Sequence, residues 1–155
     1  MKIRKVDIRD VPIIQAIINQ YAKRGKLLPR ALGDIYENIR DYCVAEVDEK
    51  IVGCCALHVV WEDIAEVKSL AVLKEFSGQG IGSELLNSAL KEARSLGVTK
   101  VFTLTYEQNF FSKKGFKPIP SSSLPHKIWG ECIRCPLFPN CKEVAMEYIV
   151  EDTGE

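Results

Sequence analysis

The sequence predicts an α/β (α+β) fold, one sheet with helices on both faces, and three observations support this. Apolar strand-like segments and amphipathic helix-like segments alternate in the order βα(α)βββαβαβ. A glycine-rich turn joins one apolar strand to one amphipathic helix. The length of 155 residues suits one domain, and 46% hydrophobic residues are enough to fill its core. We therefore expect residues 1–155 to form a single domain.

The first half of the chain is expected to hold two helices and four strands. Alternating apolar residues predict a strand over 2–8. Asp10 is suited to cap the helix that follows, with Pro12 in its first turn. The apolar stripe of that helix is Ile13, Ile14, Ile17, Ile18 and Tyr21. The remaining elements are a short helix over 34–40 and strands over 42–47, 51–60 and 63–72, consecutive and antiparallel.

The second half is expected to alternate helices and strands around one long loop. The predicted elements are a helix over 84–96 ended by Gly97, a strand over 101–104, a short helix over 107–114 and a strand over 144–150. The loop, 118–143, carries five of the seven prolines. A loop of this length inside a compact domain is usually functional or held by another group.

The stretch from Ser77 to Ser83, with glycines at 78, 80 and 82, lies between the strand and the long helix. Glycines let the backbone approach a ligand and point several N–H groups one way, and the helix N-terminus adds partial positive charge. This pattern predicts an anion site for a phosphate or pyrophosphate. Ser83-Glu84 follows the last glycine where a Walker A loop needs Lys-Ser/Thr, and the spacing does not fit a dinucleotide-binding turn.

Composition excludes several classes of function. Lys+Arg and Asp+Glu both number 21, so no basic field favours nucleic acid. The apolar runs are too short to span a membrane, and Met1–Lys5 has no apolar stretch typical of a signal peptide. A cytoplasmic location is the expectation. Most of the six cysteines are then expected to be thiols or metal ligands.

Two segments resemble the GNAT N-acetyltransferase superfamily: 65–86, which contains the glycine turn, and 110–116, which ends in Gly-Phe. The resemblance covers about residues 1–118 and the last strand. It implies the GNAT acyl-CoA N-acyltransferase fold, a mixed, mostly antiparallel sheet in which the strand over 63–72 splays from the next strand. It implies acetyl-CoA as the donor, with pyrophosphate on the turn. A narrower resemblance, through 25–30 and Leu104-Thr105-Tyr106, is to short stand-alone N-acetylglutamate synthases, which serve arginine biosynthesis.

The resemblance also implies which residues contact CoA. The pantetheine arm is expected beside Leu70, Ala71 and Val72. The remaining CoA-binding residues implied are Ser77, Gly78, Gln79, Gly80, Ile81, Gly82, Ser83, Phe110 and Phe111. Ser77 departs from the family pattern, which has Gln or Arg there, so one side-chain contact is expected to be lost.

Acetyl transfer needs a base, because an amino-acid amine is mostly protonated at pH 7. Glu66 is the candidate, since it lies in an apolar strand and matches the base position of a GNAT branch. Its side chain is predicted to share a face with Lys68 and Leu70. The alternative for Glu66 is an exposed carboxylate paired with Lys68. The tyrosine slot of many family members holds Phe111, so Tyr106 is the candidate acid, and unaided thiolate departure stays open.

The acceptor implied by the resemblance is a small amino acid, glutamate first. Arg30 suits its carboxylate through two hydrogen bonds, and Lys26 is the second choice. Glu107 stands where some synthases carry Arg, and it would repel an anionic acceptor if it faced the cleft. Another small amine, a protein amine, and a non-catalytic acetyl-CoA-binding module remain alternatives. Neither nucleic acid nor membrane is expected as a partner, and a homodimer is left open.

The long loop carries a candidate zinc site. Cys132, Cys135 and Cys141 form C-x2-C-x5-C, and His126 lies upstream. Four such ligands bind zinc tetrahedrally, although the loop lacks a second C-x2-C pair, so buried or redox-active thiols are the alternative. Cys43, Cys54, Cys55 and His58 lie in predicted strands and are expected to be core residues.

Overall fold

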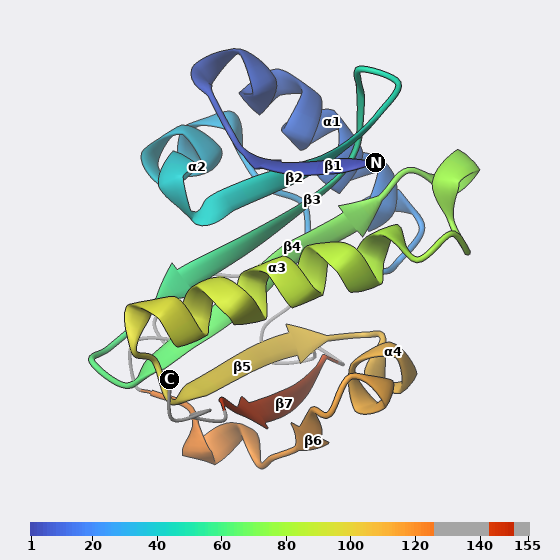
Figure 1. Cartoon of the computed structure of the whole chain (residues 1–155). Coiled ribbons are helices and arrows are strands. Elements are labelled where there is room, and N and C mark those ends of the chain that lie inside the picture. The colour runs from blue at the N-terminus through green and yellow to red at the C-terminus, as the bar shows by residue number, and fades with distance from the viewer. Residues whose placement is uncertain (126–142, 151–155) are drawn as a thin grey trace.

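A computed structural model describes residues 1–125 and 143–150 and places a seven-stranded sheet between helices (Figure 1). The strand order is β1-β2-β3-β4-β5-β7-β6, and among the strands of these described residues only the β4–β5 pair is parallel. The predicted mixed, mostly antiparallel sheet is confirmed. The strands are β1 (Lys2–Lys5), β2 (Tyr42–Val47), β3 (Lys50–Val59), β4 (Ile64–Val72), β5 (Lys100–Thr105), β6 (Lys117–Pro118) and β7 (Val144–Ile149).

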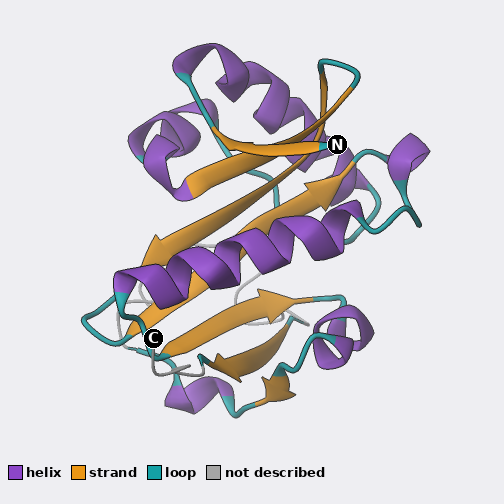
Figure 2. Cartoon of the chain, in the orientation of Figure 1, coloured by secondary structure: helices purple, strands orange, loops and turns teal. Residues whose placement is uncertain are grey.

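Helices lie on both faces of this sheet, as predicted. Figure 2 shows α3 running across the front of the sheet, with α1 and α2 beyond the strands. The helices are α1 (Val11–Lys23), α2 (Leu32–Glu37), α3 (Ile81–Leu96) and α4 (Gln108–Lys113). Short 3-10 turns precede α1 (Ile8–Asp10), β2 (Ile39–Asp41) and the glycine turn (Lys74–Phe76), and a fourth lies at Ser121–Ser123.

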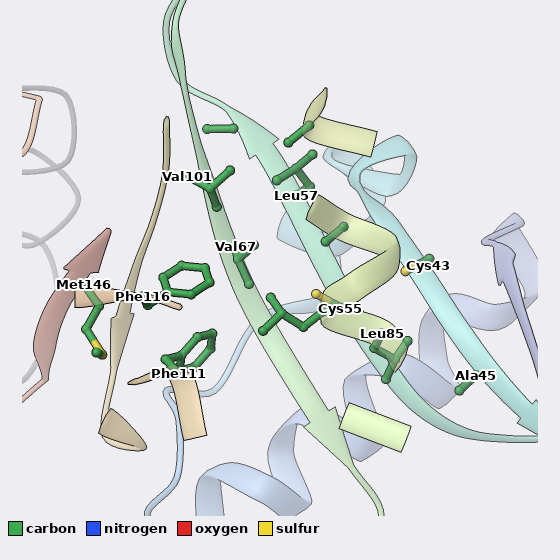
Figure 3. Close-up of a cluster of buried hydrophobic side chains, with 14 of the residues drawn as sticks. Cys43, Ala45, Cys55, Leu57, Val67, Leu85, Val101, Phe111, Phe116 and Met146 are labelled. Atoms are coloured by element: carbon green, nitrogen blue, oxygen red, sulfur yellow. The ribbon is translucent and has the colours of Figure 1, made fainter. Parts of the chain in front are cut away.

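The two faces of the sheet carry separate apolar cores because side chains alternate along each strand. On β3, Cys55 and Leu57 pack in the α3 core, whereas Cys54 and Ala56 pack in the α1 core. Figure 3 shows the α3 core, in which Cys55 and Leu57 of β3 lie on the same side of the sheet as Leu85 of α3. All three strand cysteines are buried free thiols, as expected.

The first helix differs from its prediction at two residues. Ile13 is 46% exposed, so the buried stripe is narrower than predicted. Asp10 makes no side-chain capping bond to α1. Its carboxylate instead accepts from Arg4 Nη1 at 2.8 Å and from the Asp7 N–H at 2.8 Å. The ion pair ties β1 to the start of α1, and the first turn of the helix, which contains Pro12, has no side-chain cap.

A β-bulge interrupts β4 at Ser69. Ala56 pairs with Lys68 and Cys54 pairs with Ala71, so Ser69 and Leu70 together face Cys55. Ser69 adopts φ +58°, which costs a non-glycine residue roughly 1–2 kcal/mol. Two contacts hold it there: the Tyr42 hydroxyl donates to Ser69 Oγ at 3.4 Å, and the Cys54 thiol donates to Ser69 O at 3.3 Å.

The bulge reverses the side-chain alternation along β4. Before it, Val67 packs in the α3 core, and after it Leu70 and Val72 pack against the same core while Ala71 lies in the α1 core. Glu66 therefore lies on the α1 side of the sheet, on the opposite face from Leu70. The prediction that Glu66 and Leu70 share a face is wrong, because it assumed an uninterrupted strand.

The bulged strand approaches β3 closely at Gly53. A Cβ there would lie 3.0 Å from Ala71 O and 3.0 Å from Leu85 Cδ1. Gly53→Ala is expected to cost about 1–3 kcal/mol of unfolding free energy, because the backbone of β4 must shift. Chemical denaturation measures this loss.

The matched control is Gly33→Ala, where a Cβ meets no atom within 4 Å. This exposed position in α2 should tolerate alanine or gain slightly from its helix propensity. Equal stability of the two variants would contradict the close approach of β3 to β4.

Candidate active site

Strands β4 and β5 are paired at only one end. Their parallel register joins Ile64 to Lys100, Ala65 to Val101 and Glu66 to Phe102, and no later pair follows. One position further on, the Thr103 hydroxyl donates to Val67 O at 2.8 Å. Figure 1 shows the strands diverging from this point. The predicted splay is present, and Glu66 occupies its apex.

The glycine turn follows β4 after the short 3-10 turn at Lys74–Phe76. Gly78 and Gly80 have φ of +77° and +81°, the left-handed region in which glycine carries no steric cost. The first helical bond after the turn is from Glu84 N–H to Gly80 O at 3.1 Å. Among the described residues, none supplies a backbone acceptor for the N–H groups from Gly78 to Ser83. These six N–H groups at the start of α3 are thus open to an anionic ligand, and the anion site expected from the sequence stays a prediction.

Side chains around the turn divide into exposed and core groups. The Ser77 hydroxyl donates to Lys74 O at 2.6 Å, so it stabilises its own turn. Ile81 is 3% exposed and offers only its backbone to a ligand. A Cβ on Gly82 would lie 3.7 Å from the Phe110 ring, which places Phe110 against the start of α3. Phe111 is 4% exposed and packs edge-on against Phe110 and Phe116, with centroids 5.1 Å apart in each pair.

Glu66 is 6% exposed on the α1 side of the sheet. Its register partner across β3 is His58, whose Nδ1 lies 2.6 Å from Asp41 Oδ2. His58 is only partly buried, so the expectation of a core histidine is wrong. The Asp41–His58 pair was not found from the sequence. Only the register of the β3–β4 hairpin, with its turn at residues 61–63, reveals that His58 stands beside Glu66.

Lys26 and Glu107 pair with each other across the split sheet. Lys26 Nζ lies 3.2 Å from Glu107 Oε1, and the Tyr21 hydroxyl donates to Glu107 Oε2 at 2.7 Å. Burial raises the pKa of Tyr21 well above its usual value, and the bond to Glu107 raises it further. Tyr21 therefore stays a neutral donor. The charge of Glu107 is balanced by Lys26, so Lys26 is not a free cation.

Arg30 lies at the end of the loop between α1 and α2. Its Nη1 is 3.5 Å from Asp34 Oδ2, and its Nε is buried without a hydrogen-bond partner among the described residues. Gln15 Nε2 donates to Arg30 O at 3.1 Å, which ties the loop to α1. Burial raises the pKa of Tyr42 to about 12, and the Ser69 bond and the Arg30 charge oppose that rise. Arg30 thus lies near Tyr42 on the α1 side.

The remaining predicted residues lie elsewhere. Tyr106 is half-buried in the turn between β5 and α4. The zinc ligands Cys132, Cys135, Cys141 and His126 lie outside the described residues, which themselves contain no group of three or more potential metal ligands. Across 1–125 and 143–150, no helix is long and apolar enough to cross a membrane.

Comparison with known proteins identifies the fold and its chemistry. Residues 38–118 match the family model of the acetyltransferase (GNAT) domain, just over half of the chain. This chain belongs to the GNAT acetyltransferase family. The chain is 37% identical, over 136 residues, to an amino-acid acetyltransferase of Mycobacterium tuberculosis, covering 85% of this chain and 77% of the relative. It is therefore a GNAT N-acetyltransferase, as the resemblance implied.

Two solved structures share this fold. A Mycobacterium tuberculosis protein in complex with CoA and a second ligand superposes with a TM-score of 0.84 at 30% identity, covering 97% of this chain and all of the other. The N-acetylglutamate synthase of Neisseria gonorrhoeae superposes with a TM-score of 0.89 at 24% identity. That likeness covers 97% of this GNAT chain but only 35% of the synthase chain.

Gly80→Ala tests the glycine turn as the CoA site. The substitution forces alanine into φ +81°, where a Cβ meets no atom within 4 Å. We expect a stability loss of about 1 kcal/mol and CoA binding weakened about tenfold or more, because the donors no longer converge. Isothermal titration calorimetry with CoA measures the affinity.

Gly97→Ala is the matched control, since Gly97 has φ +86° at the other end of α3. It should lose similar stability and keep wild-type CoA affinity. Equal weakening of CoA binding by both substitutions would contradict the site.

Proposed function

We propose that this GNAT enzyme transfers the acetyl group of acetyl-CoA to the α-amine of a small amino acid, with L-glutamate as the first candidate. The proposal includes a cytoplasmic role in arginine biosynthesis. The observation that carries it is Arg30, whose buried Nε lacks a partner among the described residues and whose charge reaches Tyr42 on the α1 side. The relative named amino-acid acetyltransferase and the synthase solved with N-acetyl-glutamate support it.

Donor and acceptor are proposed to approach from opposite faces of β4. The turn N–H groups hold the pyrophosphate of CoA, and pantetheine follows Leu70 to Val72 where β4 is free of β5. The acceptor binds on the α1 side, where Arg30 takes its carboxylate. The amine of the acceptor then reaches the thioester of acetyl-CoA at the point where β4 and β5 separate.

Glu66 is proposed as the base that removes the amine proton, directly or through a water. Its place at the apex, where β4–β5 pairing ends, supports this role. The free amine attacks the acetyl carbon, the C–N bond forms, and the C–S bond breaks. The attacking nitrogen then loses its second proton, which balances the proton that the departing sulfur takes up. A backbone N–H near Leu70 to Val72 is proposed to stabilise the oxyanion. The products are the N-acetyl amino acid and CoA.

The departing sulfur needs a proton or must leave as thiolate. Phe111 fills the family's tyrosine slot inside the apolar core and has no proton to give. Tyr106, half-buried at the end of β5, is the candidate donor. A thiol pKa of roughly 8.5 also makes thiolate a fair leaving group, which water then protonates.

One observation favours a second candidate acceptor, another small amino acid with a single carboxylate. Glu107 occupies Lys26 through their 3.2 Å ion pair, whereas Arg30 has a longer contact of 3.5 Å with Asp34. Of the two cations predicted from the sequence, Arg30 is therefore the one that we assign to an acceptor carboxylate. A glutamate acceptor would bring a second carboxylate to the same side of the sheet. A panel of amino acids separates the two candidates.

Thiol release from acetyl-CoA in the presence of each of the twenty amino acids tests the proposal. We expect glutamate or a close neutral analogue to accelerate release. Arg30→Ala should raise the acceptor KM about 10- to 100-fold, the value of one charge-assisted pair, with little change for amines that lack a carboxylate.

Arg94→Ala is the control, because Arg94 is an exposed cation in the last turn of α3. It should leave every KM unchanged. Equal losses in Arg30→Ala toward acidic amino acids and toward simple amines would rule out its carboxylate role, and no response to any amino acid would rule out the proposed function.

Glu66→Gln tests the base. We expect kcat/KM at pH 7 to fall about 100-fold, and the loss to shrink toward pH 10, where the amine is already free. Stopped-flow thiol release across this pH range measures both. A wild-type rate at pH 7 and at high pH alike would show that Glu66 is not the base.

A further inference from the structure

The Asp41–His58 pair lies on the face of the sheet that carries Glu66. His58 comes from β3 and Asp41 from the 3-10 turn that precedes β2, and His58 Nδ1 lies 2.6 Å from Asp41 Oδ2. Both side chains are partly open to solvent, at 32% for His58 and 22% for Asp41. The Asp41–His58 pair therefore lies between the buried side chains on this face of the sheet and the solvent.

His58 and Glu66 are direct partners in the antiparallel β3–β4 register. Residues directly opposite in such a pair project to the same face, with Cβ atoms about 4.5–5.5 Å apart. Side chains of this length can exchange a proton directly or through one water. The charged groups that face His58 from the adjoining elements are Asp41, Glu66 and, two pairs further along β4, Lys68.

We propose that His58 carries the amine proton from Glu66 to solvent and that Asp41 positions it for that task. The inference rests on the proposed role of Glu66 as base. Glu66 is 6% exposed, so a proton that it accepts cannot pass freely to bulk water. Imidazole is the side chain suited to exchanging protons near neutral pH.

Asp41 determines which nitrogen of His58 accepts the proton. An ionised carboxylate only accepts hydrogen bonds, so Nδ1 of neutral His58 must carry the hydrogen. Nε2 is then the unprotonated nitrogen.

The proton transfers balance without a further reactant. The amine N–H⁺ bond breaks and its proton passes to the Glu66 carboxylate, while the amine lone pair attacks the acetyl carbon. Glu66 then gives the proton to His58 Nε2, which forms imidazolium. Imidazolium releases a proton to water, and both side chains return to their starting states.

Replacing His58 by alanine should lower kcat about tenfold or more and leave the KM of acetyl-CoA unchanged. Imidazole added to the solution should restore most of the lost rate, because it can replace the missing proton carrier. Wild-type enzyme and Arg94→Ala are the controls, and imidazole should not accelerate either. An unchanged kcat in His58→Ala, or a loss that imidazole does not restore, would overturn the proposal.

Two further variants separate proton transfer from structural support. His58→Gln keeps a hydrogen-bonding side chain but cannot carry the proton, so its kcat should stay low. Asp41→Asn leaves His58 without its carboxylate, and kcat should fall in it as well. If His58→Gln or Asp41→Asn has the wild-type kcat, the role is structural and the proposal fails.

A measurement that needs no acceptor distinguishes this proposal from the proposed function. Imidazole ¹⁵N chemical shifts of the folded protein at pH 8, assigned by comparison with His58→Gln, report which nitrogen of His58 carries the hydrogen. The expected form has it on Nδ1, and a hydrogen on Nε2 would overturn the proton path. Wild-type enzyme that fails to respond to any amino acid would instead overturn the acceptor assignment.

Discussion

The β-bulge at Ser69 is the constraint on which the rest of the site depends. It places a non-glycine residue at φ +58°, and the Tyr42 hydroxyl and the Cys54 thiol hold it there. Because the extra residue reverses the faces of β4, Leu70 and Val72 close the core beneath α3 while Glu66 lies on the α1 side. One GNAT strand thus has its backbone beside the glycine turn and its carboxylate on the opposite face, where we propose that the acceptor binds.

The parting of β4 from β5 divides the sheet, and a polar contact rejoins the two halves at the acceptor side. Glu107, just after β5, accepts from Tyr21 at the end of α1 and from Lys26 in the loop that follows. These contacts join segments more than 80 residues apart and hold the loop that carries Arg30. We infer that this bridge fixes the position of the acceptor side relative to the donor side. We also infer that it leaves Arg30 as the cation that binds the acceptor carboxylate.

Local features of this architecture could be predicted from the sequence, and long-range ones could not. Strand β2 at Tyr42–Val47 and the turn before α3 follow from alternation and glycine spacing. The bulge could not be predicted, because Ser69 has no local signal for φ +58° and is held there by partners on β2 and β3. The Asp41–His58 and Lys26–Glu107 pairs depend on hairpin register and on chain folding across 17 and 81 residues. The sequence shows that Glu107 carries a charge, but it does not show that Lys26 lies close enough to neutralise it.

The central claim is that the donor binds the turn before α3 while the acceptor binds the opposite face of β4. Two-dimensional NMR of the backbone amides, first with CoA and then with an amino acid added, tests this claim most directly. The account predicts that CoA shifts the amides of residues 78–83 and that the amino acid then shifts those around Arg30, His58 and Glu66. Shifts from CoA that spare the turn, or an amino acid that perturbs only the α3 face, would contradict the account.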